Sequence, residues 1–313
     1  MPKRKVRMTF SQEVKEELEK HINSSRHCQL AEMAAYVLNE AEIGESLVFK
    51  VDNESLARKI FTLIKKTYNI NALVEQEIFN KTTLHKICIT DKEDMHKVLS
   101  SVKYDSGSQQ GKTVSPLIVK NSCCKRAYLQ GTFLCIGSMS SPDKSYHLEF
   151  SSSDQGQLEQ IKNIIADFDI EARITTRKKG FVLYVKEGES IVDLLNIMGA
   201  HVSLMNMENV IILKNMRNTL NRRVNCETAN IIKSVNASTR QIDDINYIIE
   251  HKEYEKLPDA LKDMADVRLK NPDTPLKDLG ALLDPPVGKS GVNHRLRRLS
   301  EIAEELRSRN GER

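Results

Sequence analysis

The sequence lacks a strong charge imbalance, because 47 Lys and Arg residues face 43 Asp and Glu residues in a chain of 313, which gives a net charge of +4. A balance this even does not by itself indicate a nucleic-acid partner, so any basic surface has to be local. The length favours two or three domains, each with enough chain to bury a core.

Long hydrophobic runs are also missing. No stretch approaches the roughly 18 apolar residues that a membrane-spanning helix needs, and no apolar segment follows the basic start made by Lys3, Arg4, Lys5 and Arg7. We therefore expect neither a signal peptide nor a membrane partner, and a cytoplasmic location. The four early cations fit either a solvated leader or a contact to phosphate.

The six cysteines do not follow the spacing of a disulfide framework or of a CxxC zinc motif. This absence predicts reduced, mostly buried thiols, with no metal ligands and no cofactor. Cys123 and Cys124 are adjacent, which leaves a redox-active pair as the alternative. The full set is Cys28, Cys88, Cys123, Cys124, Cys135 and Cys226.

Two short amphipathic helices are predicted in residues 275–306, PLKDLGALLDPPVGKSGVNHRLRRLSEIAEEL. The first follows Pro275, which suits the first turn of a helix, and Pro285 and Pro286 end it. Gly288 leaves the chain free to turn. The second helix is predicted to begin near the cap Ser290 and to bury one apolar face. The apolar positions of the two helices are Leu276, Leu279, Leu282, Leu283, Val292, Leu296, Leu299, Ile302 and Leu306.

The outward face of the second helix is cationic at its start. Residues 289–299 contain four cations and no acid, whereas three glutamates follow within residues 301–305. This order opposes the helix dipole, and it suits a helix whose first turns meet a polyanion, as the recognition helix of a helix-turn-helix protein does in the major groove of DNA. The connection over residues 284–289 is longer than in the simplest helix-turn-helix, so we expect a variant.

This pattern assigns candidate DNA-binding roles. Asn can pair with adenine and Arg with guanine, while Lys, Ser and backbone amides at a helix start can hold phosphate. A solvated, arginine-rich helix face is the alternative. The candidates for base edges are Asn293, Arg295, His294 and Arg297, and those for the backbone are Lys289, Ser290 and Arg298.

The sequence predicts an α+β unit that is present twice in the first two thirds of the chain, at an offset of about 96 residues. The predicted helices and strands follow the same order in both copies. In the first copy they are helices 10–21, 28–40, 54–68 and 91–102 and strands 46–51, 73–79 and 84–89; in the second they are helices 124–137, 157–168 and 191–198 and strands 146–150, 172–177 and 181–186.

The offset superposes small residues on one helix face. Ala31 and Ala35 match Ala127 and Gly131, and Cys28 matches Cys124. Because small side chains let two helix backbones approach closely, the two helices are predicted to pack on each other about a pseudo-twofold axis. Further helices at 217–237, 238–254 and 258–270 are predicted to supply the core for the last two.

These residues resemble known families. Residues 129–137, LQGTFLCIG, look like a degenerate LAGLIDADG motif of homing endonucleases. The segments CKRAYLQGTFLCIGSMSSPDKSYHLEF (124–150) and PPVGKSGVNHRLRRL (285–299), and the opening FSQEVKEEL, resemble the WhiA family of regulators of sporulation and cell division in Gram-positive bacteria. That resemblance implies an α+β LAGLIDADG-like repeat domain that no longer cuts, followed by an all-α helix-turn-helix domain.

The expected domains are a first repeat at 1–103, a linker at 104–120, a second repeat at 121–215 and a helical DNA-binding domain at 216–313, with its motif at about 275–307. The resemblance further implies a transcription regulator of the cell cycle and cell division, associated with the nucleoid and with chromosome segregation. The expected partners are double-stranded DNA and other transcription or division proteins, with no small-molecule substrate.

Loss of nuclease activity is expected because the resemblance places a metal-binding acid at the end of each motif helix. These positions hold Glu40 in the first repeat and Ile136 in the second, and isoleucine cannot bind a cation. Glu42 and Asp143 lie nearby and could compensate, so a residual metal-dependent endonuclease is one rival function. An interaction scaffold of the division apparatus is another.

The repeat domain could also grip DNA without cutting it. Cations on or beside the predicted strands would contact phosphate if they shared a concave sheet face, although a solvated face explains them equally well. They are Lys50, Lys86, Arg173, Arg177, Lys178, Lys179 and Lys186.

Overall fold

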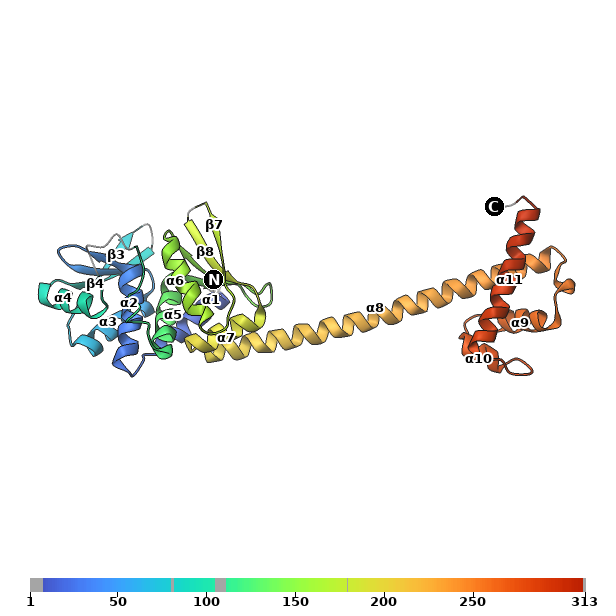
Figure 1. Ribbon diagram of the computed structural model, residues 1–313, viewed down its shortest axis with the longest axis horizontal. Helices are drawn as coiled ribbons and strands as arrows, with labels where there is room; N and C mark the ends of the chain where they lie inside the picture. The colour runs from blue at the N-terminus through green and yellow to red at the C-terminus, as the bar shows by residue number, and fades with distance from the viewer. Residues whose placement is uncertain (1–7, 80–81, 105–110, 179, 312–313) are drawn as a thin grey trace, which may run out of the picture. The chain divides into compact units, whose positions relative to one another are not determined.

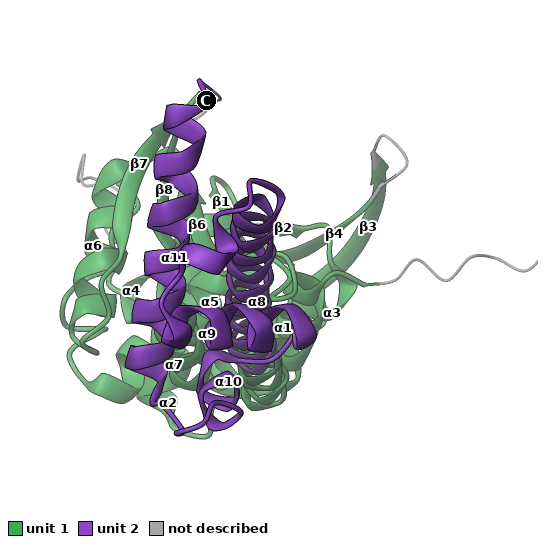
Figure 2. Cartoon of the chain, turned by 90° about the vertical axis from the view of Figure 1, so that its right-hand side faces the viewer, with its two compact units in different colours: residues 1–214 green, residues 215–313 purple. Residues whose placement is uncertain are grey.

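The computed structural model describes residues 8–79, 82–104, 111–178 and 180–311. The chain divides into two compact units, residues 1–214 and 215–313, coloured separately in Figure 2. The basic start of the chain and Lys179, both considered above as phosphate contacts, lie outside the described residues.

Unit 1 contains the two repeats (Figure 1). The described elements of the first are α1 (Phe10–Lys20), α2 (Arg26–Glu40), β1 (Ala41–Ile43), β2 (Leu47–Val51), α3 (Glu54–Tyr68), β3 (Leu73–Phe79), β4 (Thr82–Ile89) and α4 (Lys92–Ser101). Those of the second are α5 (Ser122–Ile136), β5 (Gly137–Met139), β6 (Leu148–Ser152), α6 (Gln155–Ala166), β7 (Arg173–Arg177), β8 (Gly180–Val185) and α7 (Gly188–Met198). The short strands β1 and β5 were not predicted.

The two sheets have the same topology, β1-β2-β4-β3 and β5-β6-β8-β7, with antiparallel pairing throughout. Their registers also correspond, because Leu47 pairs with Ile89 in one sheet and Leu148 with Val185 in the other. The predicted duplication is therefore confirmed at the level of individual residue pairs, and with it the α+β repeat fold.

Several helices of unit 1 begin with side-chain caps. Thr9 and Gln12 form a reciprocal capping box at the start of α1. Asn53 accepts hydrogen bonds from the amides of Ser55 and Leu56 and starts α3. Because such caps satisfy amides that have no helical partner, they fix where each helix starts.

Helices α2 and α5 pack directly on each other in the core of unit 1, as their small residues predicted. A Cβ added to Gly131 would lie 2.9 Å from the Cβ of Ala35 and 3.1 Å from the carbonyl oxygen of Glu32. Ala31 and Ala127 are buried beside this contact. The helices therefore approach so closely that even a methyl group at Gly131 would force them apart.

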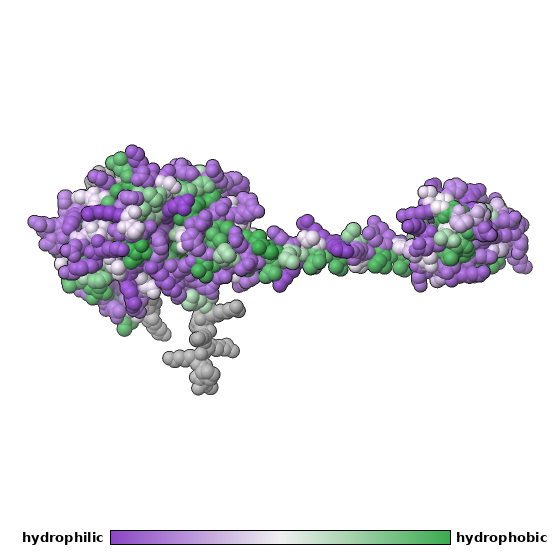
Figure 3. Space-filling model, turned by 90° about the horizontal axis from the view of Figure 1, so that it is seen from below, coloured by the Kyte–Doolittle hydropathy of each residue, from purple (hydrophilic) through white to green (hydrophobic). Residues whose placement is uncertain are grey.

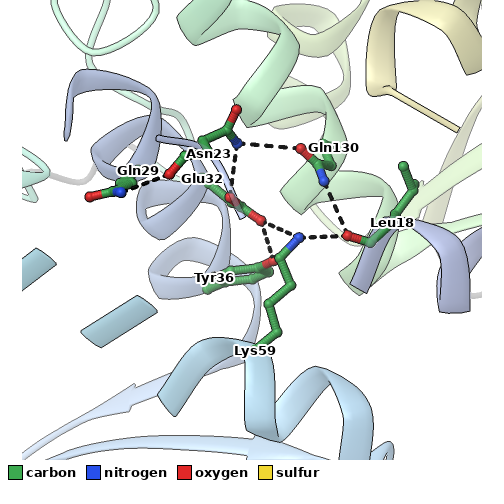
Figure 4. Close-up of polar contacts among 7 residues, drawn as sticks. All are labelled: Leu18, Asn23, Gln29, Glu32, Tyr36, Lys59 and Gln130. Carbon is green, nitrogen blue, oxygen red and sulfur yellow. Dashed lines mark hydrogen bonds and ion pairs between the residues drawn. The ribbon is translucent and has the colours of Figure 1, made fainter. Parts of the chain in front are cut away.

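A buried charge pair lies next to this helix contact (Figure 4). The ammonium of Lys59 in α3 lies 2.7 Å from a carboxylate oxygen of Glu32, and both side chains are at most 1% exposed. Lys59 also donates to the carbonyl of Leu18, and Glu32 accepts hydrogen bonds from Tyr36 and Asn23. Each charge thus has several polar partners, which offset the cost of removing it from water.

Helix α8 (His201–Glu250) is one continuous helix of 50 residues, and the division between the two units falls within it. The prediction of two helices at 217–237 and 238–254 was therefore wrong. Many apolar side chains of α8 are exposed, and green patches along it are visible in Figure 3. They are Val202, Met205, Ile212, Leu213, Met216, Leu220, Val224, Ile231, Ile232, Val235 and Ile249.

In unit 2, a 3₁₀ turn (Tyr254–Lys256) and helices α9 (Asp259–Lys270), α10 (Leu276–Ala281) and α11 (Lys289–Arg309) pack around the last turns of α8 (Figure 2). The core joins Ile245 and Ile248 of α8 to Met264 of α9 and to the apolar face of α11. This core fixes the helix whose outward face carries the candidate residues.

Within the described ranges, no helix is both long and apolar enough to span a membrane. The cysteines are free thiols, but only Cys28 and Cys124 are buried, while Cys123 and Cys226 are exposed. The expectation of mostly buried thiols was therefore wrong.

Candidate nucleic-acid interface

Helices α10 and α11 form a helix-turn-helix with a close backbone contact at the turn. The amide of Val287 donates to the carbonyl of Gly280 at 2.9 Å. A Cβ at Gly280 would lie 2.0 Å from the carbonyl oxygen of Val287, so only glycine fits this position without moving the backbone. Leu279 and Leu283 bury the other side of the turn against Val292 of α11.

The cap of α11 lies two residues earlier than predicted. Gly288 is the cap, its carbonyl accepts from the amide of Val292, and Ser290 is the second helical residue. Ser290 is exposed and does not act as the cap. No acid is present in the first turn, so the positive end of the helix dipole is not compensated by a carboxylate within the helix there.

Six of the seven predicted DNA-binding residues are exposed on α11: Lys289, Ser290, Asn293, His294, Arg297 and Arg298. The buried side of the same helix is formed by Val292, Leu296, Leu299, Ala303 and Leu306. At 3.6 residues per turn, Ser290, Asn293, His294 and Arg297 lie on the side opposite to those apolar residues. The structure therefore brings these four onto one outward face.

Arg295 is placed differently from the other six. It is only partly exposed, and its Nη1 donates to the carbonyl of Ala260 in α9 at 3.4 Å. Its guanidinium thus holds α11 against α9. It lies at the edge of the outward face of Ser290, Asn293, His294 and Arg297, which is called the recognition face below.

Arg297 and Arg298 both contact Glu301. Arg297 Nε lies 3.2 Å from one carboxylate oxygen of Glu301, and Arg298 Nη1 lies 3.0 Å from the other. The hydrogen bond from Arg298 and the charge of Arg297 lower the pKa of Glu301, so this carboxylate is ionised at neutral pH. Because all three side chains are exposed, the pairs are weak, and a phosphate could replace Glu301 as the partner of either guanidinium.

Two arginines behind the recognition face hold unit 2 together and were not identified from the sequence. Arg268 is 3% exposed and donates to Gln241 of α8 and to the carbonyl of Thr274. Arg307 lies 2.8 Å from the buried carboxylate of Asp244 in α8. From the sequence alone, these two arginines cannot be distinguished from the DNA-binding candidates. Their contacts with partners inside unit 2 show that their role is structural.

Five of the predicted strand cations of unit 1 already have a partner among the described residues, whereas Lys178, which follows β7, is exposed. Lys50 pairs with Glu42 and Lys86 with Glu77. The same holds in the second sheet, where Arg173 pairs with Glu171 and Arg177 with Glu149. Lys186 lies over the ring of Tyr184, with its Nζ 4.8 Å from the ring centre. The carboxylates offset the charge that a phosphate-binding saddle would need.

The ends of the two motif helices carry Glu40 and Ile136 at equivalent positions, 14 residues after Arg26 and Ser122. Burial raises the pKa of Glu40 to about 7, with a smaller contribution from the charge of Asp52. The nearby Lys15 ammonium is directed at the carbonyl of Leu134 at 3.0 Å. One carboxylate that is partly protonated at neutral pH is a poor ligand for a hard divalent cation.

Comparison with known proteins gives one consistent family. Three family models match: the WhiA N-terminal LAGLIDADG-like domain at residues 26–96, the WhiA LAGLIDADG-like domain at 125–217 and the WhiA C-terminal HTH domain at 220–303. A protein named probable cell division protein WhiA from Lachnoclostridium phytofermentans is 46% identical over 96% of this chain and all of its own length.

Other relatives agree along the whole chain. The protein of the same name from Thermoanaerobacter pseudethanolicus is 43% identical over 96% of this chain and 99% of its own. The crystal structure of a full-length WhiA protein from Thermatoga maritima matches with a TM-score of 0.60 at 26% identity, covering 95% of this chain and 99% of that one.

Proposed function

The chain belongs to the WhiA family, and from this membership we propose that it is a non-enzymatic, sequence-specific DNA-binding regulator of transcription that acts in cell division and chromosome segregation. The relatives named probable cell division protein support the division role. The observation that carries the DNA-binding role is the exposed face of α11, where Ser290, Asn293, His294 and Arg297 lie opposite the buried residues.

In this proposal α11 enters the major groove with its first turns. Asn293, His294 and Arg297 read base edges, while Lys289, Ser290 and Arg298 contact the backbone. Arg295 is assigned a positioning role in addition to any base contact, because it donates to the carbonyl of Ala260. The partner is double-stranded DNA, and the proposed location is the nucleoid.

The domain boundaries form part of the same proposal: repeats at 1–103 and 121–215, joined by 104–120, and a DNA-binding domain at 216–313. The division into compact units after residue 214 supports the last boundary. In the connection, Val114 and Val119 are buried in the core of unit 1, so its described part packs on the repeats. A role in sporulation rests on the family resemblance alone.

A non-enzymatic role is supported by the end of the motif helices. Ile136 stands where a second carboxylate would be needed, and burial raises the pKa of Glu40 to about 7. The rival, a residual magnesium-dependent endonuclease, predicts plasmid nicking that is lost in Glu40→Gln.

The test is a salt titration of binding to a set of labelled genomic duplexes, in magnesium, with Asn293→Ala/Arg297→Ala compared against the wild type. We expect the variant to lose discrimination between fragments by roughly 30-fold or more, because the two base contacts together contribute about 2–6 kcal/mol of discrimination. Weaker, salt-dependent binding should remain, because Lys289, Ser290 and Arg298 still face the duplex.

Arg309→Ala is the matched control, since Arg309 is exposed near the end of the same helix, 12 residues beyond Arg297. It should discriminate as the wild type does. If the double variant and the wild type select the same fragments with equal affinity, α11 does not read sequence and the proposal fails. Cleavage products on the same gel would instead support the endonuclease.

A further inference from the structure

Four potential metal ligands meet where the two motif helices begin. The ligand atoms of His27, Cys28, Cys123 and Cys124 all lie within 4.8 Å of one another, and this is the one such group of three or more His, Cys, Asp and Glu side chains found in the described part of the chain. The Nδ1 atom of His27 faces the three thiols, 3.3 Å from the Sγ of Cys28, 3.3 Å from that of Cys124 and 3.9 Å from that of Cys123.

The cluster follows the internal symmetry of unit 1. His27 and Cys28 are the second and third residues of α2, and Cys123 and Cys124 are the second and third residues of α5. Each repeat therefore contributes two adjacent ligands from the same turn of its motif helix. No single segment has the spacing of a zinc motif, which is why cysteine spacing alone predicted no site.

The two helix starts share a second feature, which α11 also has. Neither the cap Ser25 of α2 nor the cap Asn121 of α5 accepts a side-chain hydrogen bond, and neither helix has an acid in its first turn. Most helices gain one or both of these, because amides at the first turn lack partners and the dipole favours negative charge. Thiolates at the third position of each helix would supply the negative charge that these two ends lack.

We propose that His27, Cys28, Cys123 and Cys124 bind one zinc ion and that this ion joins the two repeats. Three thiolates and an imidazole are the donor set of a closed, structural zinc site. The soft sulfur ligands exclude magnesium and calcium, which require oxygen.

The geometry is close to what tetrahedral coordination needs. With Zn–S bonds of about 2.3 Å and Zn–N bonds of about 2.0–2.1 Å, sulfur and nitrogen ligands lie about 3.6 Å apart and two sulfurs about 3.8 Å apart. The observed distances from the imidazole nitrogen, 3.3 and 3.9 Å, bracket the first value. Binding through Nδ1 leaves the proton of His27 on Nε2, and the three thiol protons pass to solvent as the metal binds.

The ion would cross-link the first turns of α2 and α5. Cys28 and Cys124 are buried, at 5% and 3% exposed, whereas His27 and Cys123 are exposed, so the site opens to solvent on one side, where the metal can enter. Closing a link between helices that begin 96 positions apart in the chain restricts the unfolded chain strongly. The site stabilises unit 1 and is independent of the DNA-reading face of α11.

The first test is the metal content of the full-length protein, purified and kept reduced, after incubation with equimolar zinc and gel filtration. We expect about one zinc per chain. Replacement by cobalt should give the ligand-field and thiolate charge-transfer bands of a tetrahedral site. Removal by a chelator should lower the melting temperature by roughly 5–10 °C, and added zinc should restore it.

Variants separate the proposed ligands from the other cysteines. Cys124→Ser and Cys28→Ser should each lose the metal, whereas Cys226→Ser, which alters an exposed thiol of α8, should retain it. His27→Cys should also retain one ion, since Cys123 shows that a cysteine fits the equivalent position, and its cobalt spectrum should shift as a fourth thiolate replaces the imidazole. Circular dichroism shows which variants are folded.

Wild-type protein that holds less than about a tenth of a zinc per chain would overturn the proposal, and so would unchanged zinc content in both Cys124→Ser and Cys28→Ser. A disulfide within the cluster that forms in low-zinc buffer and persists after zinc is added would also overturn the proposal. Counting free thiols with an alkylating reagent detects that bond. DNA discrimination by α11 should be the same with and without zinc, so failure here is distinguishable from failure of the proposed function.

Discussion

The two units of this chain use their charged residues in opposite ways. Unit 1 buries Glu32 against Lys59 between packed helices and pairs four of its strand cations with carboxylates. Unit 2 leaves Lys289, Arg297 and Arg298 exposed on α11, with Glu301 as the only acid of the first thirteen residues of that helix. The comparison indicates that the ratio of cations to nearby acids marks a binding surface better than the number of cations, because one carboxylate, Glu301, faces two arginines on α11, whereas each of four strand cations in unit 1 has a carboxylate of its own.

The largest expected effect is the loss of the buried charge pair in unit 1. Lys59→Met should lower the free energy of unfolding by about 3–5 kcal/mol, because it leaves the carboxylate of Glu32 buried without its cation. Denaturant unfolding followed by circular dichroism measures the change. DNA discrimination by the folded fraction should be unaffected, because the pair lies far in the chain from α11.

Arg58→Met is the control for this change, since Arg58 is the preceding residue of α3 and makes an exposed pair with Glu54. It should cost less than about 1 kcal/mol. Adding Glu32→Gln to Lys59→Met should recover part of the loss, because the neutral amide removes the buried charge. Equal unfolding curves for Lys59→Met and Arg58→Met would show that the buried pair contributes nothing to the free energy of unfolding.

The second prediction compares the two close backbone contacts. Gly280→Ala should destabilise unit 2 by about 2–3 kcal/mol or more and weaken DNA binding, because its Cβ would meet the Val287 carbonyl oxygen at 2.0 Å and displace the start of α11. Gly131→Ala should cost less, since its closest contact is the Cβ of Ala35 at 2.9 Å. Thermal unfolding and the duplex titration measure the two effects.

Gly288→Ala is the control for the helix-turn-helix, because a Cβ there has no neighbour within 4 Å and its φ of −66° suits alanine. It should cost only a few tenths of a kcal/mol to about 1 kcal/mol, the usual range for alanine at a cap. Wild-type DNA affinity in Gly280→Ala would mean that α11 does not depend on this contact for its position.

Much of unit 1 could be read from the sequence because it is repeated. The match of Ala35 to Gly131 predicted the helix contact, and the order of helices and strands along the chain followed from two weak patterns that agreed with each other. The same offset also placed Cys28 on Cys124. The cluster was missed because zinc motifs are sought within one segment, whereas here two adjacent pairs from helices 96 positions apart complete the set.

The long helix α8 was predicted wrongly because its apolar residues do not keep one continuous face. The apolar positions of 217–237 and 238–254 were therefore assigned to two separate helices. A better signal was the absence of glycine and proline between residues 201 and 256. These two residue types most often end or kink a helix, so a segment without them can form one long helix. In α11 the cationic face was predictable from spacing, but the contact of Arg295 with α9 depends on tertiary packing.

The third prediction concerns the carboxylate left at the end of α2. Burial raises the pKa of Glu40 to about 7 from an ordinary value of 4.5, so between these values the folded protein holds a proton that the unfolded chain has lost. Stability therefore falls as pH rises from 4.5 to 7. Glu40→Gln should remove this part of the decline and stabilise the protein by about 1–3 kcal/mol at pH 8, measured by denaturant unfolding at several pH values.

Part of the decline should remain in that variant, because burial also raises the pKa of Glu19 to about 7. Glu42→Gln is the control: Glu42 is an exposed carboxylate that pairs with Lys50, and its replacement should leave the pH dependence almost unchanged. If Glu40→Gln instead destabilises the protein at pH 8, an ionised Glu40 has a favourable partner, and a cation site at this end of the helices would have to be reconsidered.

The smallest expected effect tests the exposed charges of unit 2 directly. Glu301→Gln should tighten DNA binding by roughly two- to fivefold, because it frees Arg297 and Arg298 from a carboxylate that competes with phosphate, and exposed pairs of this kind contribute less than about 1 kcal/mol. The gain should shrink as salt is raised, because salt screens exposed charges. Glu305→Gln, an exposed acid one turn later, is the control and should change affinity less. Weaker binding by Glu301→Gln would mean that the carboxylate orients the two guanidiniums for DNA, so that its pairs with them prepare the surface instead of neutralising it.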